Sequence, residues 1–186
     1  MTTSLINEII KEPGIYFRGI ALGDLISKAE KKEGHYAEKK LYSNPFIRYD
    51  FEIGEMEEMF LYYNFLESDE LVNEITLHFI HYPDYYWKKE GNSMNDFHQL
   101  VFEKHQIPSS QVFEDTLKDV IIHFTEAFKK EPSIITTDSV FKEAYHNYRC
   151  YRWEIENDVR LSVMTYCDDS DTSTMKNTMK ISLRRF

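Results

Sequence analysis

The sequence has few of the residues on which cofactor-dependent chemistry usually relies. Its 186 residues include only 6 glycines, 5 prolines and 2 cysteines. The glycines are scattered singly, so none belongs to the glycine-rich loop with which P-loop and dinucleotide-binding proteins hold phosphate. The HExxH, GxSxG and paired CxxC patterns are also missing, which removes the usual sequence support for zinc hydrolases and α/β-hydrolases. We therefore expect no cofactor.

Histidine spacing gives no sign of a metal site. His98 and His105 could share one helix face, but they are seven positions apart, whereas neighbouring helical ligands are usually three or four apart. His78 and His81 fall three apart in a predicted strand, where alternation directs them to opposite faces. We expect none of these histidines to bind a metal.

Long apolar runs and an excess of positive charge are lacking as well. No segment approaches the roughly 18 uninterrupted apolar residues that a membrane-spanning helix needs. Residues 1–11 show no basic head followed by an apolar stretch, so we expect no secretory signal. The net charge of −10 argues against nucleic acid, which binds clustered Lys and Arg. These features favour a soluble cytoplasmic protein that contacts neither membrane nor nucleic acid.

Aromatic residues, in contrast, are abundant. The 13 Phe, 13 Tyr and 2 Trp make up 15% of the chain, and hydrophobic residues as a whole make up 42%. Side chains of this size supply ample apolar surface for a packed interior. The length suits one domain, and we assign residues 1–186 to it.

Three antiparallel strands are predicted in the first half of the chain, at 46–53, 56–66 and 71–82. The Gly54–Glu55 dipeptide has the glycine-first form of a two-residue hairpin loop, which would place Phe51 opposite Glu58. A four-residue loop then places Phe60 opposite Leu77. Apolar faces coincide in this register, and a shift by one residue would separate them.

Three more strands are predicted near the C-terminus, at 149–156, 159–167 and 176–185. A three-residue loop containing Asn157 and Asp158 places Trp153 opposite Leu161, since Asn or Asp tolerates the left-handed backbone of such a loop. A longer loop can bring Ile181 opposite Leu161.

This second register also predicts the state of the two cysteines. Cys150 lies on the face that carries Arg152, whereas Cys167 lies on the opposite face with Leu161. Side chains on opposite faces of a pleated strand pair cannot come close enough for a disulfide. We expect two free thiols, which fits a reducing compartment.

The elements together predict a two-layer α+β domain in which helices cover one face of antiparallel sheet. The strongest helical pattern runs from about 110 to 130, with an apolar stripe at helical spacing and Pro132 after its end. Short hairpin connections favour antiparallel strands over parallel winding. Two tandem helix-plus-meander halves, 1–91 and 92–186, are one interpretation of this order. The pairing leaves open whether six strands form one sheet or two.

One charged residue falls on the apolar face of the first meander. The predicted register puts Glu58 between Phe51 and Phe79, with His81 diagonally next to it. A carboxylate in such surroundings is costly unless it is paired, hydrogen-bonded or reached by water, and these surroundings also shift pKa values in ligand pockets. One hypothesis is therefore a pocket between sheet and helices with Glu58 and His81 at its polar end. The alternative is a carboxylate at a sheet edge or beside a surface cation.

An aromatic segment follows the third strand and contains Tyr82, Tyr85, Tyr86 and Trp87. Tyr and Trp are enriched at protein contacts because they bury much area at small entropic cost. If the rings are exposed, they form an interaction surface; otherwise they fold back and cap the core.

Two functional hypotheses follow. The leading one is a non-enzymatic binding protein, whose partner would be a protein, as for an acidic immunity-type protein, or a second copy of the chain. Acidity, missing catalytic signatures and the aromatic segment support it. The alternative is a small-molecule-binding or hydrolytic domain with its pocket at Glu58 and His81, and a metabolite bound to the purified protein would favour it.

Overall fold

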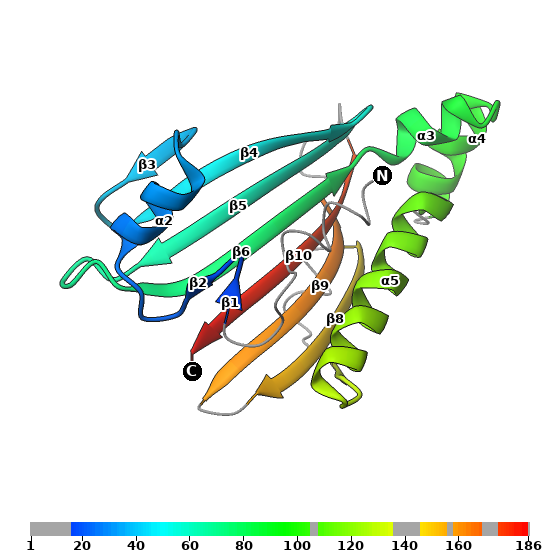
Figure 1. Ribbon diagram of the computed structural model, residues 1–186. Coiled ribbons are helices and arrows are strands. Elements are labelled where there is room, and N and C mark those ends of the chain that lie inside the picture. The colour runs from blue at the N-terminus through cyan, green and yellow to red at the C-terminus, as the bar shows by residue number, and fades with distance from the viewer. Residues whose placement is uncertain (1–15, 105–107, 136–145, 156–157, 169–174, 186) are drawn as a thin grey trace.

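One eight-stranded antiparallel sheet contains both predicted meanders (Figure 1). The computed structural model describes residues 16–104, 108–135, 146–155, 158–168 and 175–185. In sheet order the strands are β3 (Glu38–Lys40), β4 (Phe46–Gly54), β5 (Glu57–Phe65), β6 (Val72–His81), β10 (Lys176–Arg185), β9 (Val159–Asp168), β8 (His146–Ile155) and β7 (Ser133–Ile135). The two meanders meet through their last strands, β6 and β10, and this pairing answers the question of one sheet or two.

Helices pack on one face of this sheet, as predicted for a two-layer α+β fold. The helical elements are α2 (Ile26–Glu33), α3 (Pro83–Lys89), α4 (Met94–His98), the π-helix η1 (Gln99–Glu103) and α5 (Gln111–Phe128). In Figure 1, α2 lies at the end of the sheet formed by β3–β5, and α5 runs along β8 at the other. A small hairpin, β1 (Tyr16–Phe17) and β2 (Ile20–Ala21), adds Phe17 and Ile20 to the same apolar core. Among the described residues, no helix is long and apolar enough to cross a membrane.

Helix α5 forms because its sequence supplies both a cap and an apolar stripe. The Ser110 hydroxyl accepts a hydrogen bond from the Phe113 amide at 3.2 Å, which satisfies one of the free N–H groups at the helix start. The buried face carries Phe113, Leu117, Val120 and Phe124, which pack into the core of the sheet. Burial of each such side chain stabilises the fold by about 1.5–3 kcal/mol.

The predicted register of the second hairpin is confirmed. Trp153 pairs with Leu161, and both are fully buried. The next pairing differs by two positions, because Ile181 lies opposite Val163 rather than Leu161. A two-residue difference keeps every side chain on its predicted face, so the core side of this meander is as expected. The two cysteines form no disulfide with each other, as predicted, and both are buried.

The predicted register of the first meander is wrong by one residue. The turn residues are Glu55 and Met56 instead of Gly54 and Glu55, and Met56 has a left-handed φ of 53°. In consequence Phe51 pairs with Met59 instead of Glu58.

The pairing of β5 with β6 changes in the same way. A register shift between Asn64 and Phe65 displaces the ladder, so that Phe60 lies opposite His78 and Leu61 lies opposite Leu77. The core therefore receives Met59, Leu61 and Tyr63, all fully buried. Alternate positions of β5 are apolar on both faces, so alternation alone did not select the buried set.

The proposed division into halves 1–91 and 92–186 stays a prediction. The sequence also predicts a short helix at about 139–147; residues 139–145 lie outside the described residues, and residues 146–147 belong to strand β8 instead.

Candidate functional site

Glu58 does not share a face with His81. Because of the register change, Glu58 pairs with Ile80 and is exposed. Its neighbour Glu57 takes the expected place: it pairs directly with His81 and is only 8% exposed. A Cβ atom at position 54 would lie 2.6 Å from the Glu57 Oε2 atom, so Gly54 leaves the space into which this carboxylate fits. The prediction that Glu58 lies beside His81 is therefore wrong, and the buried carboxylate next to His81 is that of Glu57.

His81 is fully buried and held on two sides. Its Nε2 atom lies 2.8 Å from the Ser110 Oγ, and its ring stacks on Tyr86 with centroids 4.0 Å apart. Burial lowers the pKa of His81 from 6.5 to about 4, so the imidazole is neutral at pH 7. Burial and the nearby Glu57 carboxylate also raise the pKa of Tyr86.

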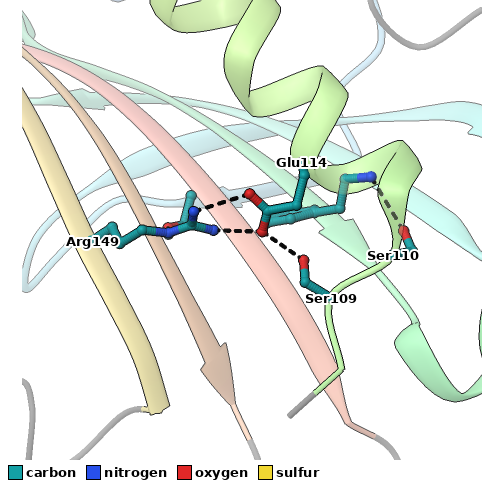
Figure 2. Close-up of polar contacts among 6 residues, drawn as sticks. Ser109, Ser110, Glu114 and Arg149 are labelled. Atoms are coloured by element: carbon teal, nitrogen blue, oxygen red, sulfur yellow. Dashed lines mark hydrogen bonds and ion pairs between the residues drawn. The ribbon is translucent and has the colours of Figure 1, made fainter. Parts of the chain in front are cut away.

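The first turn of α5 is tied to strand β8 by an ion pair (Figure 2). Arg149 donates two parallel hydrogen bonds to the Glu114 carboxylate, at 2.7 and 3.0 Å. The Ser109 hydroxyl donates a third to the same group at 2.7 Å. The Arg149 guanidinium lowers the pKa of Glu114. Two-point pairing of this kind fixes geometry as well as charge.

Next to this ion pair lies a cavity of about 360 Å³. It is lined by Ser109, Phe113, Glu114, Tyr148, Arg149, Thr165, Tyr166 and Asn177. Asn177 is 5% exposed, and its buried Nδ2 atom has no hydrogen-bond partner in the part of the chain that the structure describes. Since a buried amide without a partner costs roughly 1–3 kcal/mol, such a group calls for a ligand or water to pair with it. Asn177 also pairs with His81 across β10 and β6, which connects the cavity to the predicted site.

The side chains that line the cavity are of the kinds that bind polar ligands. Hydroxyl, amide and guanidinium groups face the cavity, and each can hold a polar ligand. His81 and Ser110 do not line it. Ser110 instead caps α5, and His81 forms a hydrogen bond with the capping hydroxyl. The role of this pair is therefore structural. Among the described residues, no group of three or more His, Cys, Asp or Glu side chains is arranged to hold a metal ion.

The aromatic segment folds against the end of the sheet. Tyr82 is buried at the start of α3, and Tyr86 stacks on His81. The Trp87 indole donates to the Ser93 carbonyl at 2.8 Å, and the Tyr85 hydroxyl donates to Glu55 at 2.7 Å. Tyr85, Tyr86 and Trp87 are only partly exposed. Their role as an interaction surface stays a prediction.

Sequence reasoning found His81 but missed Glu114, Arg149 and Asn177. The serine pair before α5 signalled a helix cap, which was a usable clue to Ser110. Arg149 and Asn177 occupy ordinary strand positions, and only the long-range pairing of β8, β9 and β10 brings them beside α5.

Comparisons with protein-family models, curated proteins and solved structures found no match to this chain. Its function is therefore inferred from the geometry of the site.

Proposed function

We propose that this chain is a non-enzymatic binding protein that holds a small polar molecule in the cavity at the start of α5. The observation that supports it most is Asn177, which lines a cavity of about 360 Å³ and whose Nδ2 atom is buried with no partner among the described residues. Ligand pockets of roughly 300 Å³ and above are common for small molecules.

The lining indicates which ligand groups would fit. Asn177 offers N–H donors, whereas the Ser109 O–H is already donated to Glu114, so the ligand should present an oxygen or nitrogen acceptor to Asn177. The charge of Arg149 is largely offset by Glu114, which argues for a neutral or zwitterionic ligand rather than a strong anion. Phe113 supplies an apolar wall for its carbon skeleton.

A protein partner is the second candidate, and partly exposed rings of α3 favour it. Tyr85 and Tyr86 lie beside Lys89, whose ammonium is 5.8 and 6.0 Å from their ring centres. Aromatic rings beside a cation are common at protein contacts, because Tyr and Arg or Lys pack well together. An acidic immunity-type protein or a homodimer could use this surface.

Mass spectrometry separates the two candidates. Purified protein would be incubated with the small-molecule fraction of the native host, separated from free solutes and examined under native conditions. We expect a retained small molecule on the wild type and its loss from Asn177→Leu. Asn92→Leu, at an exposed position of the same residue type, is the matched control. Retention of the molecule by both variants would contradict the assignment of the cavity.

A further inference from the structure

The face of the sheet that points away from α2 and α5 carries a second hollow, of about 390 Å³. Its centre is formed by Ser162 and Ser182, which pair across β9 and β10 and are 7% and 4% exposed. Their short side chains create the hollow because longer side chains surround them. We call this site the cationic hollow, and its other charged or hydroxyl-bearing lining residues are Glu74, Tyr148, Arg152, Tyr166, Lys180 and Arg184.

Three cations converge on the two serines. Arg152 pairs directly with Ser162 across β8 and β9. Lys180 and Arg184 stand two positions before and after Ser182 on the same face of β10, each roughly 7 Å along the strand. The surroundings are thus positively charged on three sides.

One carboxylate, Glu74, lies opposite Arg184 across β6 and β10 and offsets part of this charge. None of Arg152, Lys180 and Arg184 forms an ion pair or a side-chain hydrogen bond within the described residues. The one carboxylate in the lining, Glu74, accepts hydrogen bonds from the Ser182 and Thr76 hydroxyls. The buried Nε of Arg152 moreover has no acceptor among the residues that the structure describes.

This local excess of positive charge contrasts with the whole chain, whose net charge is −10. The positive charge also acts on Cys150, which lines the hollow. Burial raises the pKa of the Cys150 thiol, while the charges of Arg152 and Arg184 lower it. Like charges held close together destabilise a fold unless an anion lies between them. Guanidinium groups and serine hydroxyls are groups that bind oxyanions. Here the Arg152 and Arg184 guanidiniums and the Ser162 hydroxyl are the candidates, because the Ser182 hydroxyl is donated to Glu74.

We propose that the cationic hollow binds an oxyanion with two or more negative charges, such as a phosphate group. A larger hollow of about 690 Å³ adjoins it and shares Glu74 and Lys180. It offers the aromatic rings of Tyr62 and His78, whose centres are 5.1 Å apart. The oxyanion would therefore be one group of a larger ligand, whose remainder lies along these rings.

Titration with inorganic phosphate tests the site. At low ionic strength and pH 7, we expect phosphate to shift the amide resonances of Ser162 and Ser182, with an affinity that falls as sodium chloride is added. Arg152→Gln and Lys180→Gln should each weaken binding about tenfold, since each removes a charge-assisted contact. Lys40→Gln, which removes an equal charge from an exposed position of β3, should leave the affinity within about twofold.

Two further readouts keep the result clear. Arg152→Gln without phosphate should melt at the same or a higher temperature than the wild type, because it removes repulsion from a cluster that lacks its anion. Asn177→Leu should bind phosphate normally, which separates this site from the cavity at α5. Equal weakening by Lys40→Gln, or no resonance shifts in the hollow at millimolar phosphate, would overturn the proposal. Citrate that competes with phosphate would support a general oxyanion site.

Discussion

The buried imidazole of His81 predicts a specific loss of stability in mild acid. Burial holds the pKa of His81 at about 4, whereas the unfolded chain has the ordinary value of 6.5. Between these values the unfolded state binds a proton that the folded state does not, so the free energy of unfolding falls as the pH drops from 6.5 towards 4. The full difference corresponds to roughly 3 kcal/mol, and about 2 kcal/mol of it is already lost at pH 5.

Chemical denaturation of the wild type and His81→Gln at pH 7.5 and pH 5 measures this effect. At pH 7.5 the variant should be less stable by about 1–2 kcal/mol, because it loses the Ser110 hydrogen bond and the Tyr86 stack. Between pH 7.5 and pH 5, however, it should lose about 2 kcal/mol less than the wild type. His98→Gln, at an exposed position, should follow the wild type.

An unchanged pH dependence in His81→Gln would refute this reasoning. It would mean that the imidazole is protonated in the folded protein, through the nearby Glu57 carboxylate or through water. His78 adds a similar contribution, since burial and Lys180 lower the pKa of His78 to about 4 as well. The variant should for that reason keep part of the acid sensitivity of the wild type.

Three further predictions concern the register and the start of α5. Leu61→Ala should lower the free energy of unfolding by about 2–5 kcal/mol, and Phe60→Ala by less, because only Leu61 is fully buried. Urea denaturation measures both values. A larger loss in Phe60→Ala would support the register predicted from sequence instead. Ser110→Ala should cost about 1–3 kcal/mol in the same assay, through loss of the helix cap and of the buried hydrogen bond; a cost within 0.5 kcal/mol, about that of an ordinary surface change, would argue against the cap. A double-mutant cycle on Glu114 and Arg149 should give a coupling of about 1 kcal/mol that decreases with salt; zero coupling at low salt would show that the ion pair does not form in solution.

The accuracy of the sequence reasoning depended on how strictly each strand alternates. Polar residues alternate with apolar ones around Trp153 and Leu161, so only one pairing of these strands buries the apolar side chains. The structure has that pairing. In β5, both Phe60 and Leu61 are apolar, so a register shifted by one residue still places apolar side chains against β4 and β6, contrary to the prediction that such a shift would separate the apolar faces. The choice between the two registers depends on Met56 adopting a left-handed backbone, a state that is uncommon for residues other than Gly, Asn and Asp.

The candidate site could also be predicted only in part from the sequence. His81 was placed correctly on the core face, but the one-residue error exchanged Glu57 for Glu58. Arg149 and Asn177 could not be recognised at all, because their significance comes from contacts between distant segments: α5 approaches β8, and β10 pairs with β6. Local periodicity predicts which face a residue lies on, but it carries no information about its partners on other elements.

The most direct test of the proposed binding function is the side-chain amide of Asn177 in solution. We would record its Nδ2 resonances by ¹⁵N-correlated NMR before and after adding the small-molecule fraction of the native host, with Asn92 as an internal reference. A bound ligand predicts a shift and slowed exchange with solvent at Asn177 and at the backbone amides of Ser109 and Thr165, while Asn92 stays unchanged. No change at these three positions, or equal changes at Asn92, would contradict a ligand in the cavity.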